Sequence, residues 1–103
     1  MIIAVFRSRV KSDQMSDYGA LADEMEAIAR TMPGFISIKG FVGEDGERLS
    51  FHEWESAAHL KAWREHPAHH AAQARGYSDF YSEFSLYVAD APRVKHFKAS
   101  AET

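Results

Sequence analysis

Apolar side chains follow two different spacings along the first third of the chain. Residues 2–10 form a short run rich in β-branched and aromatic side chains, bounded by a polar stretch that begins at Lys11, which is typical of a β-strand. Over residues 14–32 the spacing changes to three or four, which indicates one apolar face of an amphipathic helix. Pro33 and Gly34 end that helix. The apolar face carries Met15, Tyr18, Leu21, Ala22, Met25, Ile28, Ala29 and Met32.

A β-hairpin is the clearest local feature of the sequence. Two β-rich runs within residues 35–56 flank Asp45 and Gly46, a dipeptide suited to the positive φ angles of a type I′ turn. With these two residues as the turn, the expected pairs are Val42 with Leu49, Gly40 with Phe51 and Ile38 with Glu53. One face of the hairpin then carries Ile36, Ile38, Val42, Leu49 and Phe51, and the other carries Phe35, Lys39, Phe41, His52 and Trp54.

The region from Ser56 to Gly76 predicts two short helices rather than one. Ser56 is a suitable N-cap, and Pro67 lacks the N–H that a continuous helix needs. Pro67 fits better as the first residue of a second helix, with His66 near its cap and Gly76 as its C-terminal stop.

A final strand is expected over residues 79–90, followed by a tail at 91–103 that is polar apart from Val94 and Phe97. One face of this strand carries Phe80, Phe84, Leu86 and Val88, and the other carries Tyr81, Tyr87 and Ala89.

The predicted order is strand, helix, strand, strand, helix pair, strand. This is the β-α-β-β-α-β order of an α+β ferredoxin-like sandwich with one four-stranded antiparallel sheet. A chain of 103 residues is a single domain, residues 1–103, with its core within about residues 2–90. Helices of this fold cover one sheet face, yet both faces of the expected strands carry large apolar side chains. Because an apolar sheet face needs a cover, we expect a homodimer packed sheet to sheet.

Composition excludes several classes of function. Apolar residues make up 46% and charged residues 26%, which are ordinary globular values. The net charge of −3, without a basic stripe, argues against nucleic acid as a partner. The absence of cysteine excludes disulfides, thiol catalysis and thiolate metal sites. The apolar run before Arg7 is too short for a signal-peptide core or a membrane span, so we expect a cytoplasmic protein without a membrane partner.

Three stretches of the sequence resemble one known family. "MPGFISIKGF", "FHEWESAAHLKAWREHPAHHAAQARG" and "FYSEFSLYVADAPRV" look like the antibiotic biosynthesis monooxygenase domain, a member of the dimeric α+β barrel group. The resemblance runs from Ile2 to about Phe97 and implies a dimeric α+β barrel. It implies no single activity, because that family includes cofactor-free oxygenases of aromatic polyketides, haem-degrading enzymes, a small-sugar isomerase and many members of unknown activity.

Three histidines, His66, His69 and His70, lie within five positions of one another. His66 and His70 are four residues apart, the spacing of two metal ligands on one helical face. Against a metal, Pro67 distorts that turn, no cysteine is present, and no acidic residue beyond Glu65 stands at a matching step. We therefore expect no metal site. The simpler alternative is a capping His66, with His69 and His70 partly in solvent.

An acid–base role is better motivated than a metal site. Cofactor-free oxygenation needs a deprotonated phenol or enol, because the electron-rich anion itself reduces oxygen. A neutral histidine suits this proton transfer near pH 7. We expect His69, or else His66 or His70, to be the base, and His52 is the next choice.

The remaining candidate residues support a bound anion and a flat ring. Arg7, if it points inward, stabilises the anion. Aromatic side chains form the wall that binds the ring and excludes water. Alternatively, Trp63 and Phe84 are core residues and Arg7 is a charge at a strand edge. The expected substrate-binding residues are His52, Trp54, Trp63, Tyr81 and Phe84.

Haem chemistry fits the sequence less well. The haem-degrading relatives carry an asparagine on the first strand, a tryptophan on the second helix and a haem-ligating histidine ten residues later. Trp63 matches the tryptophan, but Arg7 stands at the first-strand position and Gln73 at the histidine position. His69 or His70 replaces that ligand only with a shift of one helical turn. We therefore expect no cofactor.

The resulting hypothesis is a cofactor-independent monooxygenase whose partners are a small aromatic or quinol-type substrate and dioxygen, in a pocket between helices and sheet. The alternatives are a non-catalytic small-molecule binding module, or a haem-degrading or isomerase-type relative. No sequence feature separates catalysis from binding alone, because both need the same apolar cavity. The sequence also leaves open which sheet face meets the helices.

Overall fold

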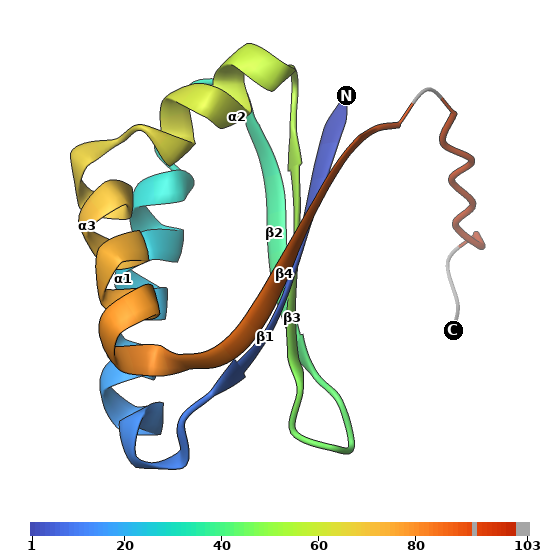
Figure 1. The fold of residues 1–103 in the computed structure, drawn as a ribbon. Helices are drawn as coiled ribbons and strands as arrows, with labels where there is room; N and C mark the ends of the chain where they lie inside the picture. Colours follow the sequence, from blue (N-terminus) through green and yellow to red (C-terminus); the bar gives the residue numbers. More distant parts are fainter. Residues whose placement is uncertain (92, 101–103) are drawn as a thin grey trace.

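A computed structural model describes residues 1–91 and 93–100, and its elements follow the predicted order (Figure 1). Strand β1 (Ile2–Val10) leads through a 3-10 turn (Ser12–Gln14) into helix α1 (Met15–Ala29). Strands β2 (Phe35–Val42) and β3 (Arg48–Trp54) form the hairpin, and helices α2 (Ala57–Arg64) and α3 (Pro67–Arg75) form the helix pair. A π-helical turn (Gly76–Phe80) then enters strand β4 (Tyr81–Asp90).

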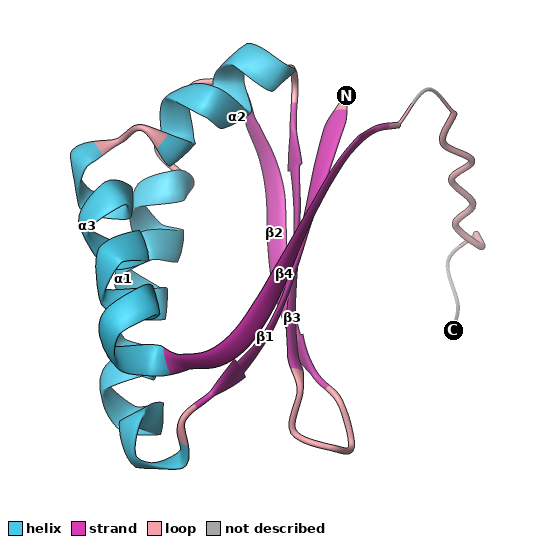
Figure 2. Ribbon diagram, in the orientation of Figure 1, coloured by secondary structure: helices cyan, strands magenta, loops and turns pink. Residues whose placement is uncertain are grey.

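The elements form two layers. The four strands lie in the order β2-β3-β1-β4, and every neighbouring pair is antiparallel. All three α-helices lie on one side of the sheet, whereas residues 93–100 lie on the other side and carry neither helix nor strand (Figures 1 and 2). The predicted ferredoxin-like α+β fold with a four-stranded antiparallel sheet is confirmed.

Alternation along the strands separates two faces, which we call the inner face, toward the helices, and the outer face. On β1, Ala4 and Phe6 are inner residues, and they pair with Val88 and Leu86 of β4. Val5 and Arg7 therefore belong to the outer face. The rest of the outer face follows from the register and includes Ile3, Ser37, Lys39, Phe41, Leu49, Phe51, Glu53, Ser85, Tyr87 and Ala89.

The hydrophobic core lies between the helices and the sheet, beside the cavity described below. Trp54 and Trp63, which come from β3 and α2, are buried there with Ala4, Ala29 and Leu60. The two indole rings stack with centroids 6.3 Å apart. Phe35 meets Trp54 edge to face at 5.5 Å. Aromatic packing therefore fixes the position of α2 over the sheet.

The predicted hairpin register is wrong by one residue. The structure pairs Phe41 with Leu49 and Ile38 with His52. The cause is the loop: Gly46 has a φ of +86°, but no residue other than glycine has a positive φ in the described part of the chain. A type I′ turn needs a positive φ at both central residues, and Asp45 does not have one. The turn is instead a three-residue loop of residues 44–46, closed by a hydrogen bond from the Gly43 amide to the Glu47 carbonyl at 2.7 Å.

The helix caps agree with the prediction at two positions and differ at a third. The Ser56 hydroxyl accepts the His59 amide at 3.2 Å, and His66 caps α3 by accepting the Ala68 amide through Nδ1 at 3.1 Å. Gly76 does not end the helical path, which continues to Phe80. A Cβ at Gly76 would lie 2.6 Å from the Tyr81 ring, so close packing requires this glycine.

Tyr81 lies on the same side of β4 as Phe84, although strict alternation along the strand predicted the two on opposite faces. The register between β1 and β4 shifts at Arg9 and Val10, so that Arg9 pairs with Glu83 and Val10 with Tyr81. Such an irregularity re-aims a side chain near the end of a strand. As a result both Tyr81 and Phe84 line the inner side of β4.

Candidate active site

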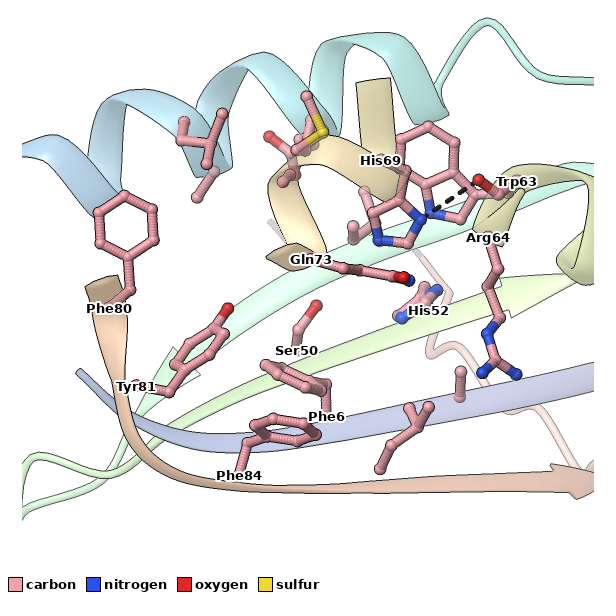
Figure 3. A pocket seen from close by; sticks show the side chains of 18 of the residues that line it. Phe6, Ser50, His52, Trp63, Arg64, His69, Gln73, Phe80, Tyr81 and Phe84 are labelled. Atoms are coloured by element: carbon pink, nitrogen blue, oxygen red, sulfur yellow. Dashed lines mark hydrogen bonds between the residues drawn. The ribbon is translucent and has the colours of Figure 1, made fainter. Parts of the chain in front are cut away.

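A cavity of about 280 Å³ lies between the helices and the inner face of the sheet (Figure 3). Its wall is mostly apolar, and this is the composition expected of a small-molecule site. The apolar lining includes Phe6, Leu21, Met25, Ile38, Leu60, Phe80, Phe84 and Leu86. The lining residues with polar groups include Tyr18, Glu26, Ser50, His52, Arg64, His69, Gln73, Tyr77 and Tyr81.

His69 enters the cavity from α3. Its Nδ1 lies 3.2 Å from the Trp63 carbonyl oxygen, and its ring stacks on the Trp63 indole with centroids 4.3 Å apart (Figure 3). Because a carbonyl oxygen only accepts, Nδ1 carries the proton and Nε2 keeps its lone pair. Burial lowers the pKa of His69 below its usual value, and nearby Arg64 and the other two histidines of the cluster lower it as well. At neutral pH His69 is therefore an uncharged imidazole with a free lone pair.

His52 enters the same cavity from β3. Its Nδ1 accepts a hydrogen bond of 3.0 Å from the indole N–H of Trp54. Since an indole nitrogen only donates, Nδ1 of His52 is unprotonated and the proton of the neutral ring sits on Nε2. Burial lowers the pKa of His52 to about 4, with a smaller contribution from His69. His52, expected as a further candidate base, is thus oriented as a hydrogen-bond donor.

Both Nε2 atoms are open to the cavity. Neither one has a hydrogen-bond partner within the described residues, and no fully buried side-chain nitrogen or oxygen there is left without a partner. Each Nε2 is therefore accessible, and both histidines line the cavity. Figure 3 shows His69 on the helix side and His52 on the sheet side.

Aromatic rings close the end of the cavity near the start of β4. Phe6 packs against Tyr81 and Phe84 with ring centroids 5.4 and 5.2 Å apart. Tyr18 of α1 packs against Tyr81 at 5.7 Å. Burial raises the pKa of Tyr81, so its phenol stays protonated at neutral pH. This end offers flat apolar surfaces to a planar ligand.

Four of the predicted site residues do not line the cavity. Arg7 lies on the outer face, where it forms a bidentate ion pair with Glu47 at 2.9 and 3.1 Å. The position of Arg7 follows from alternation, because its neighbour Phe6 points inward. His66 is engaged as the cap of α3, and His70 is exposed. Trp54 is completely buried behind the wall.

The other predicted residues come together: His52, His69, Trp63, Tyr81 and Phe84 all line the cavity. Sequence reasoning missed six lining residues with polar groups: Tyr18, Glu26, Ser50, Arg64, Gln73 and Tyr77. Two of them follow a periodicity that was available: Ser50 is two residues from His52 on a strand, and Gln73 is four residues from His69 on a helix. Arg64 is the only arginine among the cavity-lining residues that the structure describes.

Metal binding has little support in this geometry. Within residues 1–91 and 93–100, no group of three or more histidine, aspartate or glutamate side chains converges as a metal site.

The same part of the chain has no helix with the length and apolarity that crossing a bilayer requires.

Comparison with known proteins shows the family of this chain. Residues 1–75 match the family model of the antibiotic biosynthesis monooxygenases. The uncharacterized protein YqjZ of Bacillus subtilis is 33% identical over 95 residues, which cover 92% of this chain and 83% of YqjZ.

Solved structures show the same fold at low identity. Rv0793 from Mycobacterium tuberculosis is similar with a TM-score of 0.78 and 22% identity, covering 96% of this chain and 98% of the other. A mutant of SnoaB, a cofactor-independent oxygenase from Streptomyces nogalater, gives a TM-score of 0.77 and 13% identity, covering 90% of this chain and 94% of the other.

Proposed function

Because the chain belongs to the antibiotic biosynthesis monooxygenase family, we propose that it is a cofactor-independent monooxygenase acting on a small aromatic or quinol-type molecule. The observation that carries this proposal is the free Nε2 of His69 inside a largely apolar cavity. A neutral imidazole in such a place is suited to remove a proton from a phenol or enol.

Proton removal is the step that His69 contributes. The substrate O–H bond breaks, the proton moves to Nε2 of His69, and the substrate keeps the electron pair as a delocalised anion. A ring carbon of this anion that carries one hydrogen then reduces and binds dioxygen. The proton returns from His69 to the resulting peroxide, and loss of water from the hydroperoxide leaves a carbonyl. Phe6, Tyr81 and Phe84 supply the flat walls for such a ring.

We also propose that a second copy of the chain covers the outer face. Apolar side chains gather there on all four strands, and Val5 of β1 lies directly opposite Phe51 of β3 at the centre of the sheet. At the edges, Phe41 and Tyr87 remain 50% and 53% exposed in the single chain. Large apolar side chains exposed on several neighbouring strands are typical of a protein interface.

Oxygen consumption tests the enzymatic proposal. An oxygen electrode follows uptake with a panel of small phenols, naphthols and hydroquinones, each corrected for its own autoxidation. With any substrate that is turned over, His69→Ala is expected to lower the rate at least about tenfold, because the base is lost. His70→Ala, which removes an exposed histidine one residue away, is the matched control and keeps the rate.

Two outcomes contradict the proposal. Undiminished oxygen uptake in His69→Ala removes the base from the mechanism. Binding of these molecules, seen as thermal stabilisation, without uptake for any member of the panel favours a binding module instead.

A further inference from the structure

We propose that His52 holds the oxygen of the ionised substrate through its Nε2–H, and that Trp54 is a positioning residue that fixes His52 in this role. The inference rests on the proposed use of the cavity for a substrate with an ionisable hydroxyl group. It assigns a second function within the site, separate from the base, and it assigns a role to a tryptophan that does not touch the cavity.

Trp54, which is buried behind the cavity wall, sets the orientation of the His52 ring. Trp54 stands two residues later on β3, is completely buried, and directs its indole N–H at Nδ1 of His52 from 3.0 Å. Trp54 is itself held by Phe35 and by the stacked indole of Trp63. The indole therefore has little freedom, and the neutral ring of His52 must place its remaining proton on Nε2.

His69 is oriented in the opposite sense. Its Nδ1–H donates to the Trp63 carbonyl, so that Nε2 carries a lone pair rather than a proton. The cavity thus presents two imidazoles of different tautomers, one acceptor on the helix side and one donor on the sheet side (Figure 3). A single hydroxyl group can use both, because it donates its proton to His69 while its oxygen accepts from His52.

Ionisation strengthens one of these contacts. After the proton moves to His69, the substrate oxygen bears negative charge and still accepts from the Nε2–H of His52. A donor aimed at the atom where charge develops stabilises the ionised state more than the neutral one. The arrangement therefore selects a neutral, weakly acidic hydroxyl compound over an ether or an amine of the same shape.

The tautomers of the free protein give the first test. Long-range proton–nitrogen NMR on protein with labelled histidine distinguishes protonated from unprotonated ring nitrogens, and His52→Phe and His69→Phe assign the two signals. At pH 7 we expect His52 protonated at Nε2 and His69 protonated at Nδ1. The opposite tautomer at either ring overturns the inference, and this measurement requires neither substrate nor turnover.

Binding of 4-nitrophenol gives the second test, because its phenolate has a distinct visible absorbance. The protein is expected to lower the pKa of the bound phenol. Trp54→Phe keeps a ring of similar shape but removes the N–H, and is expected to weaken phenolate binding about tenfold while binding of neutral 4-nitroanisole changes little. His52→Phe is expected to have the same effect, and His70→Gln is the control without effect.

The outcomes separate this inference from the oxygenase proposal. Equal loss of phenolate and ether binding in Trp54→Phe assigns the tryptophan a packing role only and overturns the inference. No binding of 4-nitrophenol to the unaltered protein overturns it too. Correct tautomers and selective phenolate binding in a protein that consumes no oxygen sustain the inference while rejecting the oxygenase.

Discussion

The two faces of the sheet use the same four strands for different purposes. On the inner face, polar groups are few and oriented: Trp54 engages one nitrogen of His52, and a backbone carbonyl engages one nitrogen of His69. On the outer face, charged groups pair with each other in solvent, as Arg7 does with Glu47, and apolar side chains lie between them with no helix or strand of the described residues packed over them. A few oriented polar groups in an apolar wall are typical of a ligand-binding site, whereas exposed apolar side chains on a sheet face are typical of a protein interface.

Replacing Phe51 by glutamate tests the interface directly. Phe51 is opposite Val5 at the centre of the outer face, so a buried charge there is expected to dissociate the proposed dimer completely. Light scattering after gel filtration measures the mass. Ala71→Glu adds the same charge on the exposed side of α3 and is expected to leave the dimer intact. A Phe51→Glu protein that stays dimeric would show that the outer face is not the interface.

Trp63→Ala, which removes a side chain packed on the inner face, is expected to lower the free energy of unfolding by about 3–5 kcal/mol. Trp63 is buried, stacks on both Trp54 and His69, and supplies the carbonyl that orients His69. Urea unfolding at a fixed protein concentration gives the free energy of unfolding. The exposed His70→Ala is the reference and is expected to change it by less than about 0.5 kcal/mol. A loss below about 1 kcal/mol for Trp63→Ala contradicts the packing described.

Stability is expected to fall between pH 6.5 and pH 4. The pKa of His52 drops from 6.5 to about 4 on folding because of burial, so below pH 6.5 the unfolded chain binds a proton that the folded chain does not. Stability present above pH 6.5 is therefore lost as the pH falls toward 4, by about 3 kcal/mol from this one group. Urea unfolding across this range measures the slope, and His52→Gln should flatten it. An equal slope in both proteins would contradict a buried, neutral His52.

Arg7→Gln is expected to have the smallest effect on catalysis. Its guanidinium pairs with Glu47 on the outer face and does not line the cavity. With any substrate that is turned over, kcat/KM per folded chain should change by less than about twofold, because removing an interaction outside the site leaves the transition state unaltered. A loss of tenfold or more would place Arg7 in the reaction.

Much of the fold was predictable from periodicity. The helical spacing of residues 14–32, the alternation of the strands and the break at Pro67 were sufficient for the element order. The hairpin register was not predictable from Asp45 and Gly46 alone, since the loop uses one more residue than a type I′ turn. A shift of one residue moved Ile38 from opposite Glu53 to opposite His52, on the cavity side.

The site was less predictable than the fold. The histidine cluster pointed to the correct helix, but which of three neighbouring histidines faces the cavity depends on how α3 is rotated after its cap. The inward or outward direction of Arg7 depends on which sheet face the helices cover. The hydrogen bond between Trp54 and His52 joins two residues on one strand, yet whether the two rings turn toward each other depends on their side-chain rotamers, which the local sequence does not determine.

Sedimentation equilibrium of the unaltered protein at micromolar concentration tests the central claim. This claim is that the helices cover one sheet face, with the site between them, and that a second copy of the chain covers the other face. A single species of twice the chain mass is the predicted result. A well-folded species of one chain mass, with native helical content at the same concentration, would contradict the account.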